Sequence, residues 1–136
     1  CAEFANKHMP NVTLLGVTVL TSTNQEGLSA IGVNNPVDEQ VLRLASLAVN
    51  HGIGGIVCSP LELPLLRKSL TASTTLVTPG IRPLNSAVGD QKRIMTPVQA
   101  KQAGANFLVI GRPILAAVNP RDALDSILQE LDSTNL

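Results

Sequence analysis

The chain has 136 residues, of which 44% are hydrophobic, 15% are charged and only 1% are aromatic. Ten basic and ten acidic residues leave no formal net charge, which argues against a general nucleic-acid or anionic-membrane binder. With no Trp, no Tyr and two Phe, a base-stacking platform for single strands is nearly excluded and the core should be aliphatic.

Residues 1–8 are typical of the end of a helix, and the first residue is Cys1 rather than Met, so we expect a fragment of a longer protein. No apolar run approaches the length of a membrane span, and no signal-peptide pattern opens the chain. Cys1 and Cys58 have no metal-binding or redox spacing. These features favour a cytoplasmic protein that binds neither membrane nor nucleic acid.

Four short apolar segments predict strands, and each is rich in Val, Ile, Leu or Thr and bounded by Gly, Pro, Ser or Asn. The segments are 13–20, 55–58, 74–78 and 106–110. Because their apolar character is nearly continuous rather than alternating, we expect strands that are buried on both faces of a parallel sheet.

Helical patterns lie between and after these segments. The helices are expected at 37–50, from Ser59-Pro60 to about 70, from Thr96-Pro97 to Gly104, and from Asn119-Pro120 to 131. Three of the four begin with a capping side chain followed by proline, which is a typical first turn. Gly52 is placed to end the first of them.

The resulting order is a strand and a helix repeated four times, at spacings of about thirty residues, with no linker between domains. We therefore expect residues 1–136 to form a single α/β unit. A complete (β/α)₈ barrel takes about 250 residues, so the chain would supply about half of one. Four parallel strands could also be most of a flavodoxin-like sheet, and the pattern alone does not choose.

The loop after the last predicted strand begins with Gly111-Arg112. Glycine lets the backbone approach a ligand, and arginine offers a fork of donors that matches phosphate oxygens. A short helix beginning at Pro113 would point free N–H groups at the same anion. A surface arginine that caps a turn gives the same pattern, so both interpretations stay open at this point.

The loop from Pro79 to Arg93 is long and combines charged residues with Pro and Gly. Loops of this length in compact domains are usually functional or disordered, and the composition suits a closing lid, although an ordinary solvated loop would look similar. Other candidates are weaker. His8 and His51 are expected to be surface or capping residues, and Cys58 to be a small buried apolar residue.

Several motifs together resemble the bacterial type of orotidine 5′-phosphate decarboxylase. They are Leu20-Thr21-Ser22, Val57-Cys58-Ser59, Leu76 to Pro83, Gly89 to Pro97, and Val109 to Ile114. The resemblance implies the C-terminal half, strands five to eight, of a (β/α)₈ barrel that forms homodimers. It also implies conversion of orotidine 5′-phosphate to uridine 5′-phosphate (UMP) in de novo pyrimidine synthesis, with no metal or organic cofactor.

The resemblance also assigns expected roles to residues at matching motif positions. Arg112, with the Gly111 backbone, would be the principal phosphate clamp, and Gln91 would reach phosphate and pyrimidine from the lid. Arg82 would bind near the phosphate end, and Thr21 with Ser22 would contact the pyrimidine. Pro79 and Gly80 would line the site.

One part of the family pattern is missing. The catalytic Asp-x-Lys-x-x-Asp motif and a second lysine, which lie on early strands, do not occur in this sequence. We therefore expect no catalytic residue here, no decarboxylation by the isolated chain, and dimerisation, aggregation or association with a missing N-terminal half. The alternatives are a non-catalytic phosphate-binding half-barrel or assembly module, a flavodoxin-like domain, and a related decarboxylase that acts on another sugar phosphate.

Overall fold

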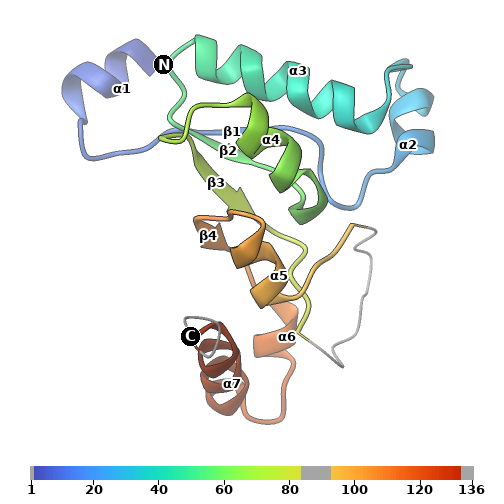
Figure 1. The fold of residues 1–136 in the computed structure, drawn as a ribbon, viewed down its shortest axis with the longest axis vertical. Helices are drawn as coiled ribbons and strands as arrows, with labels where there is room; N and C mark the ends of the chain where they lie inside the picture. Colours follow the sequence, from blue (N-terminus) through green and yellow to red (C-terminus); the bar gives the residue numbers. More distant parts are fainter. Residues whose placement is uncertain (1, 84–92, 133–136) are drawn as a thin grey trace.

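The computed structural model describes residues 2–83 and 93–132. Its centre is one parallel sheet (Figure 1). The strands are β1 Leu15–Val17, β2 Gly55–Val57, β3 Thr75–Thr78 and β4 Phe107–Leu108. Each strand pairs with the next one in the chain, in the order β1-β2-β3-β4. This order has no point at which the sheet reverses direction, so the flavodoxin-like alternative is excluded and the half-barrel is confirmed.

The helices come between the strands and after the last one. Their bounds are α1 Ala2–His8, α2 Gln25–Ala30, α3 Val37–Asn50, α4 Leu63–Ser69, α5 Pro97–Gln102, α6 Arg112–Leu115 and α7 Pro120–Asp132, with a 3₁₀ turn, η1, at Pro60–Glu62. The four expected helices are confirmed, the second of them as η1 followed by α4. Helix α2 was not expected; Asn24 caps it by accepting a hydrogen bond from the Gly27 N–H at 3.1 Å.

Local capping explains why the expected helices begin where they do. Ser59 and Thr96 each form a capping box, in which the cap side chain and the residue three positions later exchange hydrogen bonds with the backbone. Gly52 and Gly104 follow α3 and α5 with φ of 82° and 101°, a conformation that only glycine adopts readily.

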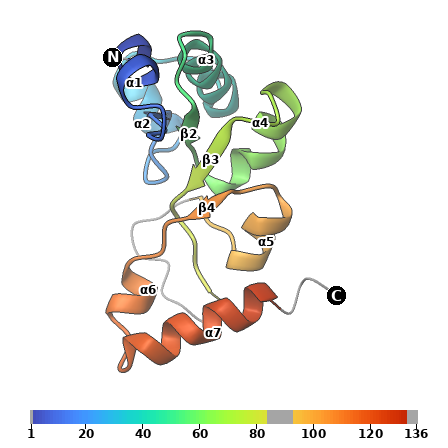
Figure 2. The same cartoon turned by 90° about the vertical axis from the view of Figure 1, so that its left-hand side faces the viewer.

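Helices α3, α4 and α5 lie along the same side of the strands (Figure 2), and the core fills the space between. In-register residues Ile56 and Leu76 point to this side and are fully buried. They belong to a cluster with Val41, Ala45, Leu63, Leu66 and Ala100 from the three helices. The core is aliphatic, as expected.

The opposite face of the sheet differs from expectation. Val17, Val57, Val77 and Phe107 are in register across all four strands. Val17 is 58% exposed and Phe107 is 62% exposed, so burial on both faces was wrong for the part of the chain that the structure describes. The apolar character of these strands is therefore not explained by the described residues alone.

The strands are also shorter than predicted, most clearly in the segments 13–20 and 106–110. The last ladder bond of the first segment runs from the Thr18 N–H to the Val57 carbonyl, at 3.2 Å. Beyond it, the backbone leaves the sheet and approaches side chains from other loops. The ends of these strands are thus set by tertiary contacts, which apolar composition does not reveal.

Candidate functional site

A cavity of about 460 Å³ lies at the carboxyl ends of the strands and is lined by the segments that follow all four of them. Seven of the eight residues expected from the sequence line it: Thr21, Ser22, Pro79, Gly80, Arg82, Gly111 and Arg112. The eighth, Gln91, lies outside the described residues. Residues that are far apart in the chain therefore meet where (β/α)-barrel proteins bind their ligands.

The cavity wall combines apolar and polar side chains. Its apolar part comes from the strands and their immediate ends, namely Val17, Val19, Leu20, Val57, Val109 and Leu115. The polar part comes from two arginines, Thr21 and Ser22. A mostly apolar wall with a few convergent polar groups is typical of a small-molecule site.

Gly111 and Arg112 occupy the turn between β4 and α6. Gly111 is the residue before the helix, and its carbonyl accepts hydrogen bonds from the Ile114 and Leu115 N–H groups, at 2.9 and 3.0 Å. A Cβ placed on Gly111 would have no neighbour within 4 Å, so the space above this backbone is open. This geometry leaves the Gly111 backbone accessible to a ligand, as the phosphate-binding interpretation requires.

Arg82 also lines the cavity and is only 7% exposed. Its Nη1 donates to the Ile81 carbonyl at 2.7 Å, and its backbone N–H donates to the Met95 carbonyl at 2.9 Å. Ile81 and Met95 also form a parallel bridge. The backbone at Arg82 is therefore held in place by Met95, which follows residues 84–92 in the sequence.

Cys58 forms part of the wall at the end of β2 and is 1% exposed. Burial raises the pKa of its thiol from 9.0 to about 11, and the neighbouring Thr78 side chain opposes this only partly. The thiol is therefore protonated near neutral pH and is a poor nucleophile. The expectation of a small buried residue is confirmed.

The two histidines lie at helix ends, as expected. His51 follows α3 and places Nδ1 2.8 Å from the Leu47 carbonyl, and His8 stacks its ring near Phe4. Neither lines the cavity. Within residues 2–83 and 93–132 there is no group of three or more side chains that could hold a metal ion. In the same residues, no helix is both long and apolar enough to cross a membrane.

A buried ion pair outside the cavity lining was not foreseen. Glu62 in η1 is 1% exposed, and it pairs with Arg93, whose side chain is 12% exposed. Burial lowers the pKa of Arg93, while Asp38 and Cys58 oppose that effect. The spacing of Ser59 and Glu62 was a sequence signal for a capping box, but nothing in the sequence pairs Glu62 with Arg93.

Consecutive parallel strands, helices along one face and a cavity at the strands' carboxyl ends define part of a (β/α)₈-barrel protein. The model of the orotidine 5′-phosphate decarboxylase / HUMPS family matches residues 1–127, and the chain belongs to this family. The resemblance inferred from the motifs is thereby confirmed.

Curated relatives carry the same family name. The chain is 52% identical over 132 residues to the orotidine 5′-phosphate decarboxylase of Opitutus terrae, a match that covers 97% of this chain and 57% of the relative. It is 57% identical over 120 residues to that of Gluconobacter oxydans, covering 88% of this chain and 51% of the relative. The chain thus spans about half the length of these relatives.

Solved structures agree with the fold. The crystal structure of orotidine 5′-phosphate decarboxylase from Lactobacillus acidophilus matches with a TM-score of 0.71 and 38% identity, over 88% of this chain and 49% of that chain. The crystal structure of orotidine 5′-monophosphate decarboxylase from Sulfolobus solfataricus matches with a TM-score of 0.65 over 99% of this chain and 55% of that chain. At 22% identity, this second match supports the fold alone.

Proposed function

We propose that the chain is the C-terminal, ligand-binding half of an orotidine 5′-phosphate decarboxylase, which converts orotidine 5′-phosphate to UMP and CO₂ in pyrimidine synthesis. The observation that carries this proposal is the cavity that gathers seven of the eight motif residues at the carboxyl end of the sheet. The names of the relatives favour an enzyme over the alternative of a non-catalytic phosphate-binding half-barrel or assembly module.

The proposed ligand lies across the cavity. Arg112 would clamp the phosphate with its guanidinium fork, and the open Gly111 backbone would let the phosphate approach. Arg82 would contribute near the phosphate end, and Gln91 would contact both phosphate and pyrimidine. Thr21 and Ser22 would bind the pyrimidine, with Pro79 and Gly80 lining the wall.

The chain would contribute to rate through binding rather than through proton transfer. Decarboxylation breaks the bond between the pyrimidine ring and its carboxylate, releases CO₂, and leaves a carbanion that a lysine must protonate. By resemblance, that lysine belongs to the Asp-x-Lys-x-x-Asp network, which this sequence does not contain. Binding energy from the remote phosphate can lower the barrier only when those reacting groups are also present.

Three further expectations belong to the same proposal and rest on the family. They are a homodimeric enzyme, a cytoplasmic location and chemistry that needs no metal or organic cofactor. Association of the chain with an N-terminal half would complete the site.

The proposal is tested by titrating the ¹⁵N-labelled chain with UMP and following the backbone amide signals of Thr21, Gly80 and Gly111. We expect saturable shifts at these positions and weaker binding of uridine, which lacks the phosphate. Arg112→Ala should weaken UMP binding by about tenfold or more, because it removes hydrogen bonds to a charged group.

Arg121→Ala is the matched control, since Arg121 is exposed on α7 and does not line the cavity. Equal affinity for UMP and uridine would contradict the phosphate assignment. The same samples should show no turnover of orotidine 5′-phosphate, and decarboxylation by the homogeneous 136-residue chain would contradict the assignment of the catalytic groups to another part of the protein.

A further inference from the structure

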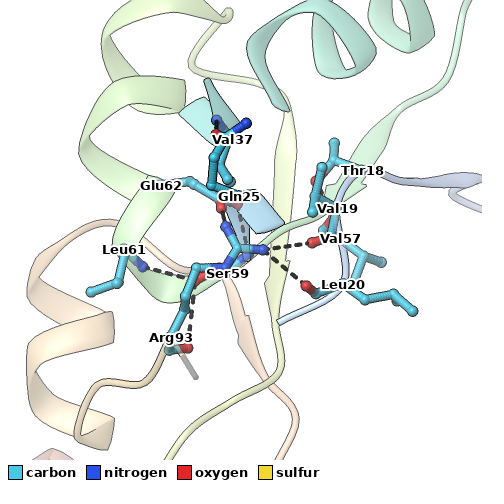
Figure 3. Close-up of polar contacts among 10 residues, drawn as sticks. All are labelled: Thr18, Val19, Leu20, Gln25, Val37, Val57, Ser59, Leu61, Glu62 and Arg93. Atoms are coloured by element: carbon cyan, nitrogen blue, oxygen red, sulfur yellow. Dashed lines mark hydrogen bonds and ion pairs between the residues drawn. The ribbon is translucent and has the colours of Figure 1, made fainter. Parts of the chain in front are cut away.

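The ion pair between Glu62 and Arg93 connects two loops at the carboxyl end of the sheet (Figure 3). The two carboxylate oxygens of Glu62 have different partners. Oε2 accepts a hydrogen bond from the Ser59 N–H at 2.9 Å, and Oε1 faces Arg93 Nη1. Glu62 is therefore fixed by the capping box that begins η1, and it fixes one side of the guanidinium in turn.

The other side of the guanidinium reaches the segment that follows β1. Arg93 Nη2 donates to the Val19 carbonyl at 3.1 Å and to the Leu20 carbonyl at 3.0 Å. The Leu20 carbonyl also accepts from the Thr23 N–H at 2.9 Å. The residues enclosed by this turn are Thr21 and Ser22, which line the cavity.

This segment has already left the sheet when it meets Arg93. Thr18 is still hydrogen-bonded to β2, donating from both its N–H and its Oγ1 to the Val57 carbonyl, at 3.2 and 3.1 Å. From Val19 onward, the path of the backbone depends on contacts such as those of Arg93. A charge-assisted hydrogen bond to a carbonyl is stronger than a neutral one, so it suits this task.

A buried ion pair is a poor source of stability, because desolvation of both charges offsets their attraction. A well-packed apolar pair of similar volume would often stabilise a fold equally well. Apolar side chains, however, could not hold two carbonyl groups at a fixed position. The chemistry of this pair therefore suits the positioning of backbone better than it suits core packing.

We propose that Arg93 is a positioning residue of the site: held by Glu62, it fixes the carbonyls of Val19 and Leu20 and so places Thr21 and Ser22 against the pyrimidine of the ligand. The part of this inference that concerns the ligand rests on the proposed function. The part that concerns the backbone can be measured without any ligand.

The first measurement is hydrogen exchange of the Thr23 amide in the free chain, relative to the amide of Ala45 in the core helix α3. Arg93→Met should raise this relative exchange rate about tenfold, because the turn loses its charged donor. Glu62→Gln should raise it less, since the guanidinium keeps a neutral partner.

The matched control is Arg67→Met. Arg67 lies in α4 and donates from Nε to the Gly104 carbonyl and from Nη1 to the Thr74 carbonyl, each at 2.8 Å, before β4 and β3 begin. It is thus a comparable arginine at the opposite end of the strands. Its loss should lower global stability but leave the Thr23 to Ala45 ratio unchanged.

The second measurement compares UMP with ribose 5-phosphate, which lacks the pyrimidine. Arg93→Lys, which keeps a charge but not the fork, should weaken UMP binding about tenfold and leave ribose 5-phosphate binding unchanged. Arg67→Met should change neither affinity once the fraction of folded protein is taken into account.

These outcomes separate the two proposals. If the unaltered chain binds neither ligand, the proposed function fails, and the exchange ratio still decides whether Arg93 positions the turn. If Arg93→Met does not fold, the ratio of Thr23 to Ala45 exchange is measured in Arg93→Lys and Glu62→Gln instead. A ratio that is the same in the Arg93 variants and in Arg67→Met overturns the positioning role, as does an equal loss of affinity for both ligands.

Discussion

Arg67 and Arg93 use the same guanidinium chemistry at opposite ends of the strands. Arg67 ties α4 to the backbone just before β3 and β4, where its contacts hold elements together. Arg93 contacts backbone just after β1, where the cavity opens. In barrels, the carboxyl end carries the site and the amino end carries stability, so equivalent substitutions at the two ends should have different consequences.

The Cys58 thiol makes the stability of the chain sensitive to alkaline pH. Its pKa is raised from 9.0 to about 11 in the folded chain, so the folded state holds the proton more tightly than the unfolded state. The resulting stabilisation is complete below pH 9 and is lost as the pH rises towards 11. Between these values, the free energy of unfolding should fall more steeply than in Cys58→Ala, by up to about 1.4 kcal/mol per pH unit.

Urea unfolding at a series of pH values measures this difference. All groups other than Cys58 are present in both proteins, so only the difference between the two slopes reports the thiol. Parallel stability curves for the unaltered chain and Cys58→Ala would show that the thiol does not contribute.

At the scale of elements, the sequence predicted what is locally determined. Ser59-Pro60 and Thr96-Pro97 carry their own capping boxes, and the helices begin where these residues indicate. Helix α2 was missed because Gly27 in its middle lowers helix propensity and its cap lies in a segment that reads as a loop.

The residues of the site also divide into those that the sequence revealed and those that only the folded structure revealed. Gly111 and Arg112 were found because a glycine and an arginine follow an apolar segment, and the family motifs supplied the other cavity residues. The contact between Glu62 and Arg93 could not be predicted, because it depends on how two loops pack after folding. Tertiary contacts of this kind also decided where the strands end.

Two glycines in neighbouring elements should respond differently to the same substitution. A Cβ on Gly55 in β2 would lie 2.5 Å from a Leu15 side-chain carbon and 2.9 Å from the Thr75 carbonyl oxygen. Gly55→Ala should therefore destabilise the chain by about 1–3 kcal/mol. Gly111→Ala meets no neighbour and should change stability by less than about 1 kcal/mol.

The two substitutions should affect UMP binding in the reverse order, with Gly111→Ala having the larger effect. The added methyl group of Gly111→Ala enters the space assigned to the phosphate and should weaken UMP binding about tenfold. Gly55→Ala should bind UMP normally at temperatures where it is folded. Thermal unfolding together with UMP titration checks both statements, and a stable Gly55→Ala would refute the packing argument.

At the scale of the whole molecule, the sheet has two edge strands, β1 and β4. Leu15 and Val17 on the first, and Phe107 on the last, are each more than two-fifths exposed. Unpaired strand edges beside exposed apolar side chains favour association with another chain. The free chain combines both features within its described residues.

We therefore expect the purified chain to self-associate, and sedimentation velocity at a series of concentrations measures this. The double substitution Val17→Thr and Phe107→Thr should shift the equilibrium towards monomer. Leu47→Gln is the control, because Leu47 on α3 is 58% exposed, as Val17 is, but lies outside the sheet. A monodisperse monomer at all concentrations would argue against this expectation.

The sequential order of the strands has a consequence for cooperativity. Because each strand pairs only with its neighbours in the chain, the sheet resembles a short one-dimensional array of repeats, whose end units can open before the centre. The β4 end is the weaker one, with a two-residue strand followed by α7, which packs mainly on α5 and α6. Arg112 belongs to that end. A ligand held by Arg112 would therefore stabilise the last strand–helix unit by mass action, and this unit would then unfold together with the rest of the sheet.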